Sequence, residues 1–237
     1  MGPLRLSTIS ILLACLPSGI RSAAQAPPTP AQALQARGVG TSTASLRQAL
    51  QNPSPQIRGM AAGELANRKD KESVPAIRQA LAKAADPNER QNLAEALITL
   101  GDPEGKAAMA ALCADSSVRD DSRIIAASQL LDAGDNSGIS SAIEILSATE
   151  DHSVRQGALE LLRRVPAVPS NLQPALQTGL EKALRDEVPS NRVAASARIA
   201  QFKLAAAGNA LRTAIVAESD IATRQQMQLN LQKLGSN

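Results

Sequence analysis

Few residues in this chain are of a type that carries out chemistry. The sequence of 237 residues contains one histidine, His152, two cysteines, Cys15 and Cys113, and no Trp or Tyr. A zinc site normally takes four Cys, His or carboxylate ligands, so this inventory predicts no metal site. His152 follows Asp151 in a predicted turn and is interpreted as an exposed turn or cap residue. Cys113 ends an apolar segment and is interpreted as a small packing residue.

Six arginines recur at a nearly constant interval and set the period of the elements. Three and seven positions after Arg58 stand Ala61 and Leu65, and the other five arginines are followed by apolar residues at the same offsets. Offsets of 0, 3 and 7 lie on one stripe of a helix, so each arginine begins the buried face of a helix. The six are Arg58, Arg90, Arg123, Arg155, Arg192 and Arg224, separated by 32 to 37 residues.

A shorter apolar helix is predicted before each of these helices, which gives six helix pairs. These first helices end at Leu50, Leu81, Leu112, Leu146, Leu184 and Ile215. The pairs are expected to stack as an all-α solenoid over residues 43–237. The polar composition of residues 224–233 is typical of a terminal cap, which must show water the face that inner repeats bury.

The turns within the pairs repeat as well. Ser153 with Gln156 predicts a capping box, and Asn88 with Gln91 predicts a related one. In the third pair, Arg119 fits the turn and Arg123 the helix, so that helix is expected to be one turn longer than the others. Four aspartates, Asp86, Asp115, Asp151 and Asp220, each lie four residues before an arginine.

Between pairs, chain reversals are predicted at residues 68–70, 101–103, 134–136 and 208–209. Pro166 and Pro169 lie in the longest interval, so a bend of the array is expected at residues 165–171.

Acidic and amide side chains follow several of the arginines. Acid–base catalysis needs two such groups within several ångströms in a desolvated cleft. Glu95 and Glu160 lie two repeats apart, roughly 20 Å by ordinary helix packing, so no catalytic residue is predicted. A candidate binding ridge is formed by Gln91, Asn92, Glu95, Gln156 and Glu160.

This pattern of helix pairs, with Asp-Pro turns and an arginine early in the second helix, resembles HEAT repeats. The short, Ala-rich repeats of bacterial proteins and of phycobilisome-lyase relatives are the most similar. The resemblance implies a right-handed solenoid whose second helices line a concave face. It also implies that the recurring Asp and Arg form a ladder bridging neighbouring turns. It is specific for fold and unspecific for function.

The first forty residues indicate export. Arg5, an apolar run from Leu6 to Leu16 and the small residues 22–24 are typical of a secretory signal at residues 1–24. Residues 12–15 resemble a lipoprotein box, so a lipid anchor at Cys15 stays an alternative to ordinary cleavage. The Pro-, Gly- and Ala-rich residues 25–42 are interpreted as a linker with one helical turn at residues 31–37. A periplasmic or envelope location is expected, and secretion is an alternative.

The charge balance argues against nucleic-acid binding. The net charge is +3, and the segment at residues 1–24 contributes two of the 25 basic residues and none of the 22 acidic ones. Nucleic-acid binders usually carry clustered, unbalanced Lys and Arg, whereas these charges are interleaved.

The sequence therefore predicts a monomeric, non-catalytic scaffold without cofactor that binds a protein or peptide. The alternative is a relative of HEAT-like bilin lyases or their chaperone subunits. A DNA-glycosylase-like protein is disfavoured by the export signal and the charge.

Overall fold

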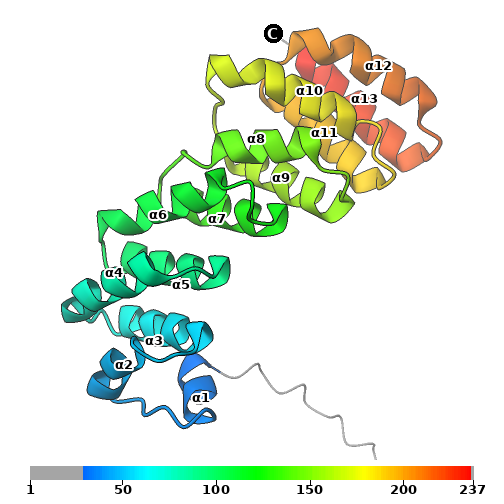
Figure 1. Cartoon of the computed structure of the whole chain (residues 1–237). Coiled ribbons are helices and arrows are strands. Elements are labelled where there is room, and N and C mark those ends of the chain that lie inside the picture. Colours follow the sequence, from blue (N-terminus) through cyan, green and yellow to red (C-terminus); the bar gives the residue numbers. More distant parts are fainter. Residues whose placement is uncertain (1–28, 236–237) are drawn as a thin grey trace, which may run out of the picture.

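The computed structural model describes residues 29–235, which form a curved array of helices (Figure 1). The predicted signal segment and Cys15 lie outside the described residues. Within residues 29–235 there are thirteen α-helices, three short 3-10 helices and no strand, so this part of the chain is an all-α solenoid. None of the helices described is long and apolar enough to cross a membrane.

The six predicted pairs are present. The first helices are α2 (Thr43–Ala49), α4 (Val74–Lys83), α6 (Pro103–Ala114), α8 (Ile139–Ala148), α10 (Gln173–Ala183) and α12 (Gly208–Ala217). The second helices are α3 (Pro55–Asn67), α5 (Pro87–Thr99), α7 (Asp120–Asp132), α9 (His152–Arg164), α11 (Pro189–Gln201) and α13 (Ile221–Gly235). The 3-10 helices Lys71–Ser73, Ser170–Leu172 and Ala205–Ala207 lead into α4, α10 and α12.

The core contains the apolar residues that the arginine spacing predicted to be buried, three and seven positions after each arginine. Of the twelve apolar residues at offsets 3 and 7, only Leu231 is incompletely buried. Many core residues are Ala, Leu and Ile, whose small or slender side chains let thin helices approach closely. The single aromatic residue, Phe202, packs on the edge of the core at the end of α11.

The helix starts differ from the sequence prediction. Asp151 caps α9 by accepting hydrogen bonds from the Ser153 and Val154 amides, and Asp86 caps α5 by accepting one from the Glu89 amide. The two predicted capping boxes are therefore wrong, because each helix begins two residues earlier than predicted and is capped there by an aspartate. α7 has 13 residues, as α5 and α9 do, so the expected extra turn is absent and Arg119 precedes the helix.

Packing begins earlier than residue 43. Helix α1 (Pro30–Gln35) packs against α3, and its Leu34 is completely buried. Val39, in the segment that follows, packs on the same apolar cluster. Residues 30–39 thus cover the N-terminal end of the array rather than tethering it, because Leu34 and Val39 fill the apolar surface that α3 would otherwise expose.

Three of the predicted reversals lie where expected, at Lys69, Gly101 and Gly134, each with φ between 58° and 81°. The fourth reversal lies at Lys203, whose φ is 53°, and not at residues 208–209, where Gly208 begins α12. Here the short helix Ala205–Ala207 continues the chain into α12.

The apolar core divides into two clusters, and the division is not at the predicted bend. Val165 and Val168 belong to one cluster with Leu162 and Leu176, so the core continues through residues 165–171. The other cluster runs from Leu34 to Leu100, and the two meet where α6 packs on α5. A Cβ added to Gly105 of α6 would lie 2.6 Å from the Ala94 carbonyl oxygen of α5. The backbones of α5 and α6 therefore pack directly against each other at Gly105.

Candidate binding surface

The recurring arginines bridge consecutive repeats along one edge of the solenoid. Arg58 donates from Nε and Nη2 to the two carboxylate oxygens of Glu89, at 2.5 and 2.7 Å. Arg192 binds Glu218 in the same way, at 2.5 and 2.8 Å. In both cases the acid belongs to the next repeat and is almost fully buried: Glu89 lies in the first turn of α5, and Glu218 follows α12. Its hydrogen bonds to Glu89 raise the pKa of Arg58.

The aspartates predicted for this ladder have a different task. Asp86, Asp151 and Asp220 accept hydrogen bonds from backbone amides at the start of their own helices. Only Asp115 takes part in the bridging, by accepting a hydrogen bond from Arg90 at 3.2 Å. Arg58, Arg155 and Arg192 therefore bridge to the next repeat as the ladder implies, but through acids other than the four predicted aspartates.

Arg123 and Arg224 use the backbone more than a carboxylate. Arg123 is 4% exposed and donates to the Cys113 carbonyl oxygen at 2.8 Å, with Asp120 and Glu144 at 3.1 and 3.2 Å. Arg224 donates to the Glu218 carbonyl oxygen at 2.5 and 2.9 Å. No further repeat follows Arg224 in the described chain to supply an acid.

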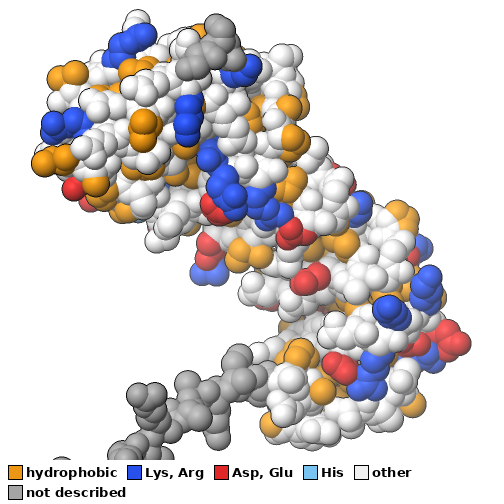
Figure 2. All heavy atoms as spheres, turned by 180° about the vertical axis from the view of Figure 1, so that it is seen from behind, with side chains coloured by type: hydrophobic (Ala, Val, Ile, Leu, Met, Phe, Trp, Pro, Cys, Tyr) orange, Lys and Arg blue, Asp and Glu red, His pale blue; other side chains and the backbone are white. Residues whose placement is uncertain are grey.

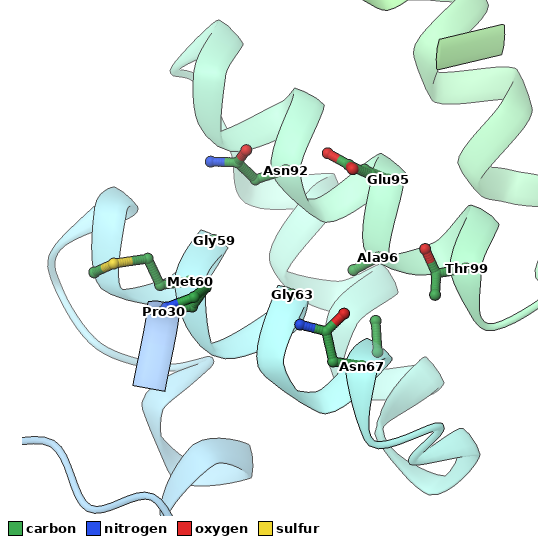
Figure 3. A pocket seen from close by; sticks show the side chains of 10 residues that line it. Pro30, Gly59, Met60, Gly63, Asn67, Asn92, Glu95, Ala96 and Thr99 are labelled. Atoms are coloured by element: carbon green, nitrogen blue, oxygen red, sulfur yellow. The ribbon is translucent and has the colours of Figure 1, made fainter. Parts of the chain in front are cut away.

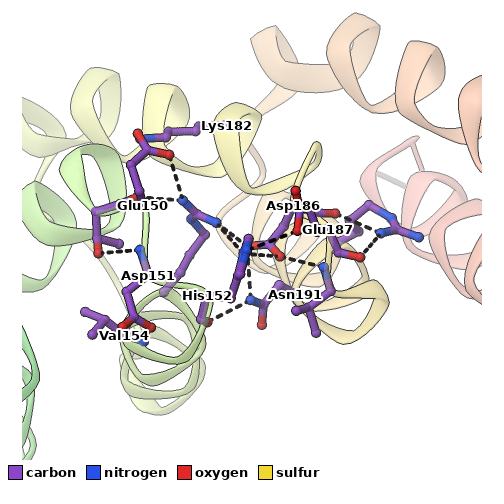
Figure 4. A network of polar contacts seen from close by, with 12 residues as sticks. Glu150, Asp151, His152, Val154, Lys182, Asp186, Glu187 and Asn191 are labelled. Carbon is purple, nitrogen blue, oxygen red and sulfur yellow. Dashed lines mark hydrogen bonds and ion pairs between the residues drawn. The ribbon is translucent and has the colours of Figure 1, made fainter.

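The most buried member of the ladder lies between the fourth and fifth repeats (Figure 4). Arg155 pairs with Asp186, and the side chains are 4% and 0% exposed. Asn191 and the Val188 amide also donate to Asp186, at 3.1 and 2.7 Å. Burial alone would raise the pKa of Asp186, but these hydrogen bonds hold it below its ordinary value.

His152 belongs to this network rather than to a separate site. Its Nδ1 lies 3.0 Å from Asp186 Oδ1, and its Nε2 lies 3.5 Å from Glu187. Within residues 29–235, no three His, Cys, Asp or Glu side chains are placed to hold a metal ion. Cys113 is buried, and burial raises the pKa of its thiol to about 11.

A second set of bridges, which the sequence analysis missed, follows the opposite edge. Arg47 in α2 and Arg78 in α4 bind Asp70 and Asp102 in the next chain reversal, with the Arg47 Nε–Asp70 Oδ2 distance at 2.8 Å. Lys106 donates to the Ala133 carbonyl oxygen at 2.7 Å. The signal was a basic residue 23 or 24 positions before an aspartate at the reversal.

The predicted ridge residues are exposed or half-buried on α5 and α9, but they do not form one cluster. Gln91 donates to Gln129 at 3.0 Å, and Gln129 donates to Glu95 at 2.9 Å. Asn92 and Glu95 line a groove described below. Gln156 is exposed, and Glu160 pairs with Arg163.

A groove of about 270 Å³ opens between α3 and α5, next to the start of α1 (Figure 3). Gly59 and Gly63 leave α3 bare at its floor. A Cβ at Gly59 would lie 2.9 Å from the Asn92 amide nitrogen, whereas a Cβ at Gly63 would meet nothing within 4 Å. Gly59 therefore leaves room for the Asn92 side chain, and Gly63 leaves open space in the groove.

The rim of this groove carries unused hydrogen-bonding groups. Figure 3 shows Met60 and Pro30 at one end and Thr99 at the other, with Asn67, Asn92 and Glu95 between. Asn67, Asn92 and Thr99 are exposed, and none of their side chains hydrogen-bonds to a described residue. The groove is smaller than ligand pockets usually are, about 300–1,000 Å³, and suits a few residues of a polypeptide.

The groove is one part of a longer surface formed by all six second helices. The positions two, five and nine residues after each ladder arginine lie on one side of these helices and are exposed or half-buried throughout. We call this the second-helix face: Met60, Gly63, Asn67; Asn92, Glu95, Thr99; Ile125, Ser128, Asp132; Gly157, Glu160, Arg164; Ala194, Ala197, Gln201; Gln226, Leu229, Lys233.

The comparison with family models agrees with a repeat architecture. The family model described as HEAT repeats matches residues 43–132, so this part of the chain is similar to HEAT repeats. Among solved structures, the crystal structure of an engineered protein is 21% identical, covers 87% of this chain and 85% of its own, and has a TM-score of 0.36. The comparison with curated proteins gives no match. HEAT repeats form helical scaffolds that often bind proteins.

Proposed function

We propose that this chain is an exported, non-catalytic scaffold that binds a polypeptide partner along its second-helix face. The observation that carries the proposal is the groove between α3 and α5, where Gly63 leaves open space beside the unpaired amides of Asn67 and Asn92. Side-chain amides have both donors and acceptors, so they match the alternating groups of an extended peptide backbone. The bare α3 surface lets that backbone come close.

Three further cavities, lined by Arg58, Arg155 and Arg192, favour a structural role for these arginines instead. These arginines are already bound to acids and backbone carbonyl oxygens of the protein. A ligand there would have to break bonds that hold repeats together. The groove offers contacts without that loss.

Export rests on the signal-like residues 1–24, and it is tested separately. Mass spectrometry of the protein recovered from its native host should find the N-terminus at Gln25. A lipid-modified Cys15 at the N-terminus would replace free export by anchoring, and an intact Met1 would contradict export.

The binding proposal is tested by filling the groove. A Gly63→Leu variant should fold normally, because the new side chain enters open space. We expect it to weaken the binding of polypeptides selected on the wild-type chain by about tenfold or more. The leucine side chain would occupy the space into which the peptide backbone is proposed to bind. Binding can be measured by fluorescence anisotropy with labelled synthetic peptides.

The matched control is Ala82→Leu, an exposed position on the outer helix α4. It adds a similar apolar side chain and should leave binding unchanged. Equal affinity of wild type and Gly63→Leu would contradict the groove, and the same loss in both variants would indicate a nonspecific effect of the added leucine.

A further inference from the structure

Three arginines stand together on the second-helix side of the molecule where α9 packs beside α11. Arg163 and Arg164 end α9, and Arg198 lies in the last half of α11. All three act electrostatically on one carboxylate, Glu160. In Figure 2, which looks onto the molecule from behind, blue and red side chains meet near the middle of the visible face.

Two of these arginines are already bound within the protein. Arg163 donates to both carboxylate oxygens of Glu160, at 2.8 and 3.0 Å. Arg164 donates to Ser128 Oγ at 2.8 Å and pairs with Asp132. Glu160 and Asp132 are therefore already paired with Arg163 and Arg164.

Arg198 is different, because it makes no hydrogen bond or ion pair with any described residue. Its Nε is buried and has no partner. A half-buried guanidinium has lost part of its hydration without gaining a protein acceptor, which is unfavourable for a charged group. Burial lowers the pKa of Arg198, Glu160 opposes this, and the charge of Arg163 adds to it.

The missing partner of such a group is a carboxylate. A guanidinium binds a carboxylate through two parallel hydrogen bonds, and charge-assisted bonds of this kind are stronger than neutral ones. A nucleic acid fits less well, because Glu95, Asp132 and Glu160 lie on the same face and would repel a continuous row of phosphates.

We propose that Arg198, with Arg163 and Arg164 beside it, binds the carboxylate of an acidic peptide segment lying along the second-helix face. The inference rests on the proposed function and adds the chemistry of the partner. The acidic residue binds at the α9–α11 end, while the neighbouring stretch of peptide occupies the α3–α5 groove. With helices packed 8–10 Å apart, the two places are roughly 20–30 Å apart, or about six to nine extended residues.

The experiment uses a phage-displayed library of random peptides selected on the full chain. Peptides retained by the wild-type protein should be enriched in Asp or Glu, and this enrichment should disappear on Arg198→Gln. For a single labelled peptide, Arg198→Gln should weaken binding by about tenfold or more. Replacing the acidic residue of that peptide by its amide should weaken binding to wild type by a similar factor and have little effect on the variant.

Two controls make the result specific. Arg212→Gln removes an arginine on the outer helix α12 and should leave the selection unchanged. Arg198→Lys keeps the charge but not the paired hydrogen bonds, so an intermediate affinity is expected. Circular dichroism checks that each variant keeps the helical fold, which Arg198→Gln should preserve because no internal bond is lost.

The failures are distinguishable. Acid enrichment that persists in Arg198→Gln, selected peptides without acidic residues, or binding of a labelled oligothymidine in place of peptides would overturn the inference; the first two leave the proposed function intact. If the wild-type chain retains no peptide of reproducible sequence, the proposed function fails and this inference fails with it.

Discussion

At the scale of single residues, the ladder arginines join one repeat to the next. Arg58, Arg155 and Arg192 each lie near the start of a second helix. Each binds an acid that belongs to the next repeat. Because the acids are buried, the pairs are intolerant of losing one partner, although a buried pair adds little net stability compared with apolar packing. They fix which repeat surfaces meet.

We expect Asp186→Ala to lower the free energy of unfolding by about 3–5 kcal/mol, because it leaves the buried Arg155 without its acid. Urea denaturation followed by circular dichroism measures the change. Arg78→Ala, which removes an exposed partner of Asp102, should cost much less. Similar losses for the two variants would show that burial of the pair is unimportant.

Stability should fall in acid. Hydrogen bonds from Arg192 lower the pKa of Glu218, and Asp186 is held low as described above. A carboxyl group with a lowered folded-state pKa stabilises the fold above its unfolded value, about 4, and loses this contribution as the pH falls through the folded value. Denaturant midpoints should therefore decrease below about pH 4, and Glu218→Gln should flatten part of that decrease. An unchanged profile in the variant would contradict the assignment.

At the scale of elements, small residues decide how closely helices approach. Gly105 of α6 touches the backbone of α5, while Gly63 of α3 faces open space. Both are helical glycines, and the sequence does not distinguish them. The contact at Gly105 is where the two apolar clusters of the core meet.

Alanine substitutions at these two glycines should act in opposite directions. Gly63→Ala should stabilise the protein by about 0.4–1 kcal/mol, because alanine restricts the unfolded chain without strain. Gly105→Ala should destabilise it by about 1–3 kcal/mol, because its Cβ is forced against the α5 backbone. Thermal or urea unfolding of the two variants provides the measurement. Stabilisation by both substitutions would show that α6 moves away from α5 without cost.

At the scale of the whole molecule, the structure is an open array in which each repeat contacts mainly its neighbours. Helix α1 covers its first repeat, and the polar helix α13 ends it. An open array offers a long continuous face, which is why partner binding is the function that the geometry supports.

The radius of gyration tests this shape. A compact chain of the described length would have a value of about 17 Å. We expect small-angle X-ray scattering to give a clearly larger value for a chain beginning at residue 29, with a distance distribution extended to one side. A value near the compact one would indicate that the two ends of the array fold onto each other.

The sequence by itself determined the repeat, because each helix must bury a stripe and the offsets of 0, 3 and 7 after six arginines mark that stripe without any knowledge of contacts. It also placed Asn92 and Glu95 on the surface, where the structure exposes both. Only the tertiary structure decided which acid each arginine binds, since the partner comes from the next repeat and Glu89, Asp186 and Glu218 look no different in sequence from solvated acids. The groove at Gly63, the contact at Gly105 and the unpaired Arg198 likewise depend on the separation of two helices, and that distance is set by packing between residues far apart in the chain.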